Sequence, residues 1–133
     1  MLKPTLKANF IGIIVMTLIS TGCSSQQRII DVHNKIVLIE SEMIDDYNDQ
    51  STAYAQAEII RSAVRKLERL DTNDLPQDYK NAILDVKDLW DDWQRALDRL
   101  NIEKADTLVD LHVVRVENLN KVAESHGMVI QRP

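Results

Sequence analysis

The sequence predicts an all-α fold, a small antiparallel up-down helical bundle that follows an N-terminal signal peptide. The 133 residues are 44% apolar and 28% charged, as is usual for one globular domain. Only 3 Gly and 3 Pro occur, too few for an architecture with many turns. After residue 28 the apolar residues recur at alternating steps of three and four, which is the spacing of one helix face.

The first 22 residues have the pattern of an export signal. They contain Lys3 and Lys7 and no acidic residue, and an apolar run follows from Phe10 to Ile19. A helix of about ten residues crosses only about half of a bilayer. The run therefore predicts a signal peptide rather than a permanent membrane-spanning helix.

The short sequence Ser20-Thr21-Gly22-Cys23 follows the apolar run and contains the only cysteine of the chain. It resembles the lipobox of bacterial lipoprotein signal peptides, in which a small residue precedes the cysteine. The resemblance implies cleavage between Gly22 and Cys23 and a lipid on the sulfur of Cys23. It also implies a lipid-anchored protein that faces the periplasm, with Ser24 favouring the outer membrane over the inner. The expected division is 1–22 signal peptide, 23–28 lipidated cysteine and short tether, 29–127 bundle, and 128–133 C-terminal tail.

The periodicity predicts helices at about 27–47, 52–70, 75–100 and 103–126. The third has the clearest apolar seam, formed by Tyr79, Ile83, Val86, Trp90, Trp93, Leu97 and Leu100. We expect Asp74 to cap its start, with Pro76 in the first turn. The fourth has the seam Ala105, Val109, His112, Val116, Leu119, Ala123 and His126, and Gly127 is suited to end it.

The number of helices depends on residues 48–52, a polar run without Gly or Pro. Asn, Asp, Ser and Thr are poor helix formers but good caps, so a short loop here gives four helices of similar length. An unbroken helix would instead exceed 40 residues and give a three-helix layout with a long first helix. That alternative places the polar residues Asp46 and Gln50 on the apolar seam, so we favour four helices.

Charge and motifs argue against several functions. All 21 acidic residues lie after residue 22, and so do all but two of the 16 Lys and Arg residues. Such an acidic domain has no general attraction for nucleic acid. No Gly-x-Ser-x-Gly elbow or Gly-rich phosphate loop occurs. We therefore expect a non-enzymatic protein without a cofactor or metal, and no nucleic acid among its partners.

The histidines allow an alternative in which the bundle binds haem or another small ligand. In b-type cytochromes a four-helix bundle holds haem between a Met on the first helix and a His on the last. In an up-down bundle two pairs would lie at matching levels, His33 with His126 and Met43 with His112. A histidine on an apolar seam is more often a core-edge residue, so this alternative ranks second.

A protein-binding face is the other candidate site. Arg61, Arg65 and Arg69 form a basic patch in an acidic domain. Trp90 and Trp93 share one helix face, where they either fill the core or, if exposed, anchor a partner protein.

The sequence as a whole predicts a non-enzymatic interaction or accessory module of the cell envelope, bound to a membrane through Cys23. A pilotin-like chaperone of a secretin is a further alternative. The segments Leu75-Pro76-Gln77-Asp78-Tyr79, Trp90-x-x-Trp93 and 122–127 loosely resemble small helical secreted bacterial proteins without an assigned activity. That resemblance implies a helical bundle and no substrate.

Overall fold

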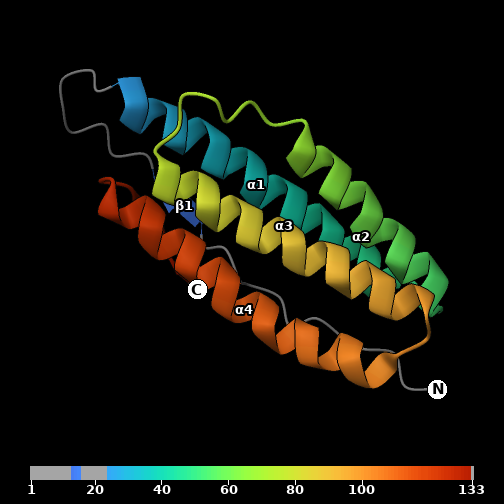
Figure 1. Cartoon of the computed structure of the whole chain (residues 1–133). Coiled ribbons are helices and arrows are strands. Elements are labelled where there is room, and N and C mark those ends of the chain that lie inside the picture. The colour runs from blue at the N-terminus through green and yellow to red at the C-terminus, as the bar shows by residue number, and fades with distance from the viewer. Residues whose placement is uncertain (1–12, 16–23, 133) are drawn as a thin grey trace.

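Four helices form the body of the protein, as the sequence predicts (Figure 1). The computed structural model describes residues 13–15 and 24–132. The elements in order are β1 (Ile13–Val15), α1 (Ser24–Asp49), α2 (Ala53–Glu68), α3 (Gln77–Asp98), α4 (Ile102–Ser125) and β2 (Val129–Gln131). Within this part of the chain no helix is long and apolar enough to cross a membrane.

The break between α1 and α2 decides between the two layouts. Thr52 has an extended backbone (φ −124°, ψ 149°), and its side chain accepts a hydrogen bond from the backbone N–H of Ala55. This is the geometry of an N-cap, in which a side-chain oxygen binds an N–H group that has no partner within the helix. The three-helix alternative is therefore wrong, because the polar run ends one helix and caps the next.

This cap gives a first prediction. Replacing Thr52 with alanine removes the acceptor, so we expect the free energy of unfolding to fall by about 1 kcal/mol in urea denaturation. Thr52→Ser keeps the hydroxyl and should preserve most of the stability. An equal loss in both variants would show that the hydroxyl does not stabilise the start of α2.

The start of α3 differs from the expectation. The residue before the helix is Pro76, which provides no side-chain cap, so the expected cap at Asp74 is wrong. Asp74 instead pairs with Arg28 of α1 at 2.9 Å, and Arg28 also donates to the backbone carbonyl of Asp71. The loop between α2 and α3 is thus tied to the beginning of α1.

The beginning of α1 is also different, because the helix starts at Ser24 rather than after a tether ending at residue 28. The side chain of Gln26 donates to the carbonyl oxygen of Gly127, just beyond α4. Gly127 has a φ of +94°, which suits glycine, and a Cβ atom there would lie 2.5 Å from Nε2 of Gln26. Residues 24–28 therefore belong to the bundle, whereas Gly22 and Cys23 lie outside the described residues.

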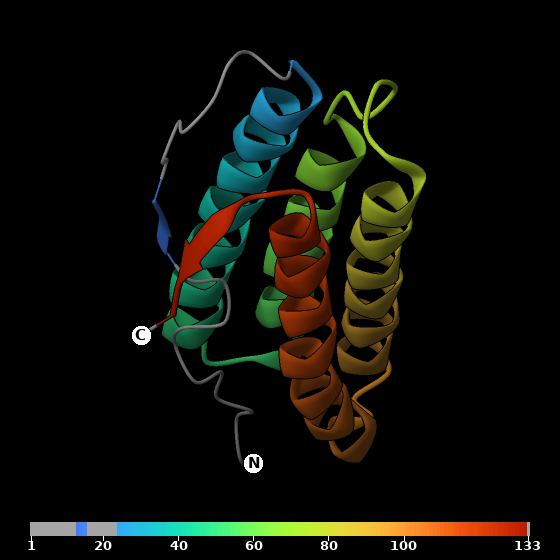
Figure 2. The ribbon, with the colours of Figure 1, turned by 90° about the vertical axis from the view of Figure 1, so that its left-hand side faces the viewer.

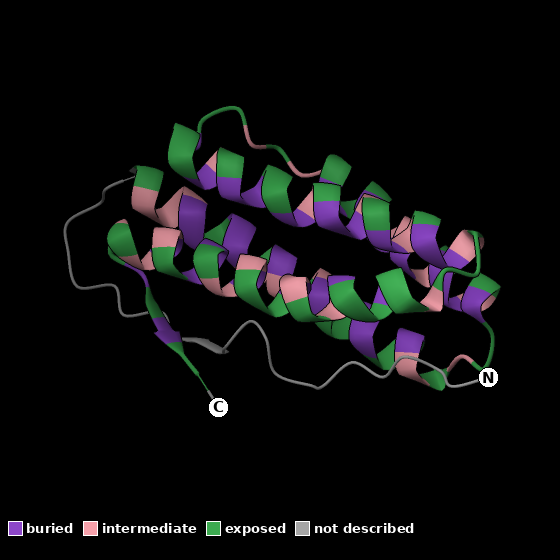
Figure 3. Cartoon of the chain, turned by 60° about the horizontal axis from the view of Figure 1, so that its bottom comes forward, coloured by how far each residue is buried: buried purple, intermediate pink, exposed green. Residues whose placement is uncertain are grey.

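The apolar seams face a common core (Figure 3). Six of the seven residues of the α3 seam are buried, and the exception is Leu100, which is 48% exposed. The helix ends at Asp98, and Leu100 adopts a left-handed backbone (φ 55°) in the turn to α4. This turn directs the side chain away from the core, so the expectation of Leu100 on the seam is wrong.

The helices pack in sequence order, α1 on α2, α2 on α3, and α3 on α4. The fourth side, between α1 and α4, lacks comparably close backbone packing among the described residues. A two-stranded ribbon lies at this side, because β2 turns back from the end of α4 and pairs antiparallel with β1 (Figure 2). The expected tail is thus partly a strand, with the side chains of Met128 and Ile130 buried.

Candidate functional site

Two buried histidine clusters join α1, α3 and α4. In the first, the side chain of His33 on α1 is fully buried. Its Nδ1 lies 2.7 Å from the hydroxyl of Tyr79 on α3, and its Nε2 lies 3.0 Å from Oδ1 of Asn120 on α4. An amide oxygen only accepts, so Nε2 of His33 has the proton and Nδ1 accepts from the tyrosine hydroxyl.

The second cluster centres on His112 of α4, which is also fully buried. The indole N–H of Trp90 on α3 donates to Nδ1 of His112 at 3.0 Å. Nε2 of His112 lies 2.9 Å from a carboxylate oxygen of Glu40 on α1, in a close contact that is poorly aligned for a hydrogen bond. Because Nδ1 accepts from Trp90, the proton of the neutral imidazole is on Nε2, facing the carboxylate.

The two clusters share one pattern with α1 and α4 exchanged. In each, an aromatic side chain of α3 donates to Nδ1 of the histidine, and Nε2 faces an oxygen on another helix. His33 is on α1 with its acceptor on α4, whereas His112 is on α4 with its acceptor on α1. These contacts connect the two helices that lack close backbone packing, so we infer that they fix the position of α1 against α4.

Burial sets the protonation state of the first cluster. Loss of solvent lowers the pKa of His33 to about 4, against a smaller opposing contribution from Asn120. The same cause raises the pKa of the Tyr79 hydroxyl above its usual value. Both groups are therefore neutral at pH 7, consistent with the hydrogen bonds between them.

The expected haem ligands occupy different environments. Both ring nitrogens of His33 and of His112 face protein groups, so iron ligation would require breaking these contacts. His126 follows the last residue of α4, and its Nε2 lies 2.9 Å from Asp78. Met43 lines a small space between α1 and α2. Over the described ranges 13–15 and 24–132, no group of three or more His, Cys, Asp or Glu could hold a metal ion.

Trp90 and Trp93 have no exposed surface, so the alternative in which they fill the core is confirmed and the alternative of a partner anchor is wrong. Trp93 packs against Tyr47 of α1, with 5.0 Å between ring centroids, and against His112 at 5.9 Å. Burial raises the pKa of Tyr47, and the nearby Trp93 opposes part of this rise. The two tryptophans fill the core and are removed from the candidate partner face.

Arg61 and Arg65 of α2 and Arg69, its C-cap, remain on the surface, although they are not equivalent. Arg61 pairs with Glu58 and Asp98. Arg65 and Arg69 are exposed, and no ion pair found among the described residues includes them. Two arginines are thus available to an acidic partner.

Tyr54 is a further surface residue of α2 that the sequence reasoning missed. It is 60% exposed and precedes Arg61 by seven residues, so it lies on the same side of the helix. The spacing of 7, 4 and 4 could have revealed it. We call Tyr54, Arg61, Arg65 and Arg69 the α2 stripe.

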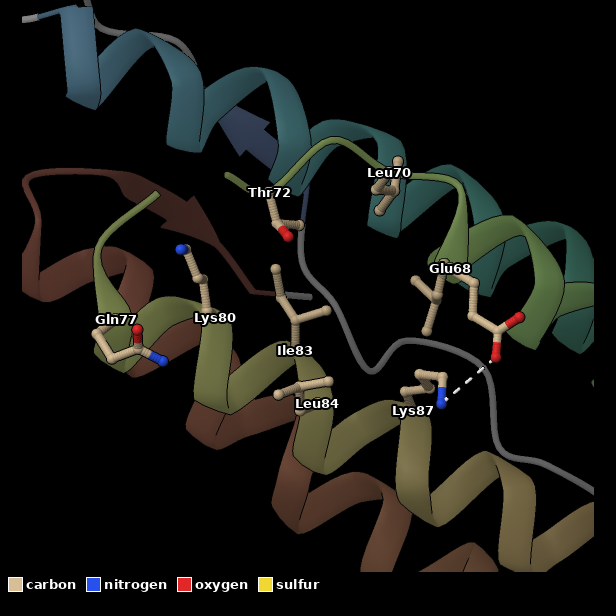
Figure 4. Close-up of a pocket in the computed structure, with 9 residues that line it drawn as sticks. Glu68, Leu70, Thr72, Gln77, Lys80, Ile83, Leu84 and Lys87 are labelled. Atoms are coloured by element: carbon tan, nitrogen blue, oxygen red, sulfur yellow. Dashed lines mark ion pairs between the residues drawn. The ribbon is translucent and has the colours of Figure 1, made fainter. Parts of the chain in front are cut away.

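A pocket of about 310 Å³ lies between the end of α2, the following loop and the start of α3 (Figure 4). Its aliphatic lining consists of Leu67, Leu70, Ile83 and Leu84. At one side Lys87 lies 3.4 Å from Glu68 and 3.4 Å from Asp91, so its charge is balanced within the protein.

Comparison with known proteins gives no assignment, because no family model, curated protein or solved structure matches the chain. A function is therefore inferred from the residues of this chain alone.

Proposed function

We propose that the protein is a membrane-anchored, periplasm-facing lipoprotein of the bacterial cell envelope. Its helical bundle is a non-enzymatic module that binds another envelope protein. The principal support is the α2 stripe, an exposed tyrosine followed by arginines on an otherwise acidic domain. Tyrosine and arginine are enriched among the residues that contribute most to binding at protein interfaces.

The anchor rests on the lipobox-like sequence that ends in Gly22-Cys23. The acyl chains of a lipidated cysteine bind membranes stably because each buried methylene contributes about 0.8 kcal/mol. Since α1 begins at Ser24, a lipid on Cys23 would be attached next to the first turn of the bundle. The residue after Cys23 is serine, which favours the outer membrane.

The histidines support a structural role in place of catalysis. A general acid or base must reach substrate in a binding cleft. His33 and His112 are fully buried, and their ring nitrogens face Tyr79, Asn120, Trp90 and Glu40. We therefore assign these polar groups to holding the helices together.

The partner that suits the α2 stripe is an acidic protein surface. Arg65 and Arg69 can each form bidentate pairs with carboxylates, and Tyr54 adds apolar contact area. Arg61 is already paired with Glu58 and Asp98, so it contributes less free charge.

The test is purification of the lipid-modified protein from its native membranes in mild detergent, followed by identification of stoichiometric companions by mass spectrometry. We expect the double variant Arg65→Glu, Arg69→Glu to lose at least about 90% of the companion, because charge reversal places carboxylate against carboxylate. Arg99→Glu reverses an exposed arginine outside the stripe and is the matched control. A companion that both variants retain would exclude the α2 stripe, and a preparation without any companion would contradict the proposed function.

A further inference from the structure

We infer that in the mature lipoprotein the position beside β2 binds an extended apolar segment of a partner protein, which pairs with Val129–Gln131 as an added antiparallel strand. This inference rests on the proposed function and deepens it by naming a second contact and its chemistry. It concerns the side between α1 and α4, and the α2 stripe is on another helix.

The structure already contains an occupant of this position. Ile13, Ile14 and Val15 pair with Gln131, Ile130 and Val129 respectively. This occupant is uncharged, β-branched and extended, which are the properties of a good strand. The position beside β2 therefore accepts a short apolar strand in antiparallel register (Figure 2).

The occupant belongs to the segment that the proposed cleavage removes. Ile13–Val15 lies within residues 1–22, before Gly22-Cys23. After cleavage the backbone N–H and C=O groups that β2 presents to β1 lose their partners. An unpaired strand edge is a template for pairing with another chain. Addition of a strand from a partner satisfies these groups and covers the ribbon again.

Several contacts hold β2 in place independently of β1. Arg132 pairs with Glu117 at 2.7 Å and with Glu124 at 2.6 Å, both on α4. The backbone N–H of Met128 also donates to the carbonyl of Ala123 at 3.3 Å. Because these bonds attach both ends of the short strand to α4, its edge is already oriented for pairing when β1 is gone.

The surroundings suit an apolar segment. Val129 of β2 is 50% exposed, and Val113 of α4 is 42% exposed. Val113 precedes Asn120 by two helical turns, and Asn120 faces α1, so Val113 lies on the α1-facing side of α4. Both side chains have this exposure while β1 is paired with β2, so a strand in the same position leaves them partly exposed, and the main-chain hydrogen bonds provide most of the binding.

The experiment uses the processed protein purified from native membranes, with the lipid on Cys23 verified by mass spectrometry. The probe is a fluorescent peptide with the sequence of residues 11–17, Ile-Gly-Ile-Ile-Val-Met-Thr, followed by lysines for solubility. Binding is measured by fluorescence anisotropy. Two matched peptides have a single backbone N-methyl group, one at the residue equivalent to Ile14 and the other at the residue equivalent to Val15.

Strand addition predicts a parity effect, because alternate N–H groups of a strand point to opposite edges. One N-methyl peptide should bind about tenfold more weakly than the parent, and the other should bind almost as well. A chain with Cys23→Ser, which prevents lipidation and keeps residues 1–22, should also bind the parent peptide at least about tenfold more weakly.

Other results would overturn the inference. Equal binding of all three peptides would indicate side-chain adhesion without strand pairing, and absence of binding would show that β2 does not accept a strand. A processed protein that is dimeric by light scattering and is not dissociated by the peptide would assign this side to a second copy. If lipid and a companion protein are present in the same preparation, such results leave the proposed function intact. If the protein in its native membranes still contains residues 1–22, that result would contradict both the proposed lipoprotein function and the inferred strand addition.

Discussion

Replacing His112 with leucine is expected to lower the free energy of unfolding by about 3 to 5 kcal/mol. The substitution leaves the carboxylate of Glu40 buried without the facing imidazole N–H, and it removes the acceptor of the Trp90 indole. Burying polar groups without partners costs more than the hydrogen bonds themselves contribute. Urea denaturation followed by circular dichroism measures this loss.

The matched variants separate this cause from a simple change of shape. Glu40→Leu leaves one neutral N–H without an acceptor and should cost about 1 to 3 kcal/mol. The double variant Glu40→Leu, His112→Leu contains no stranded carboxylate, so it should be more stable than His112→Leu alone. If the two losses simply add, the pair does not interact and the assignment of its role is wrong.

Acidification is expected to weaken the fold through His33. Its pKa is about 4 in the folded protein and about 6.5 when unfolded, so the unfolded chain binds more protons between these values. The contribution of neutral His33 is complete above pH 6.5 and is lost as the pH falls towards 4. The loss is about 3 kcal/mol in total, from 1.36 kcal/mol per pH unit over about two and a half units.

Urea denaturation at several pH values from 7 to 4.5 measures the slope of the free energy of unfolding against pH. His33→Gln has no titrating ring and should flatten it, although hydrogen bonding to Tyr79 and Asn120 is altered. Lys35→Gln changes an exposed residue of the same helix and should keep the slope. The pKa values of Asp74 and Asp78 are lowered by Arg28 and His126 respectively, so these carboxylates affect stability only at more acidic pH. A slope unchanged in His33→Gln would assign the acid sensitivity to other groups.

The helical pattern was sufficient to predict the fold because each helix buries one face, and burial leaves a period of 3.6 in the sequence. It placed His112 on the apolar seam of the last helix correctly, and this side chain is fully buried. It could not identify Tyr79, Asn120 or Glu40 as partners of the two buried histidines, because these residues are 46, 87 and 72 positions distant along the chain. Glu40 is the clearest case, since a single charged residue near a seam resembles any solvated glutamate until its neighbours are known.

The sequence prediction is wrong at residues that pair with a distant side chain or lie in a turn. Asp74 was suited to cap α3, but it pairs with Arg28 across the bundle. Leu100 matched the seam by spacing, but the turn to α4 begins before it. Periodicity groups Arg61, Arg65 and Arg69 on one side of a helix, but it does not show that Arg61 already has the acidic neighbours Glu58 and Asp98.

The start of α1 at Ser24 has a consequence for how far the protein extends from a lipid surface. A helix of 26 residues is about 39 Å long, and it would rise from the anchored residue without an intervening flexible linker. The 16 residues of α2 run back over only about 24 Å, so Arg69 would lie about 15 Å above the start of α1 and Arg61 about 12 Å higher. A partner that binds the α2 stripe would therefore do so within a narrow range of distances from the lipid surface. Inserting a flexible segment between Cys23 and Ser24 would change that height without altering any side chain of the α2 stripe.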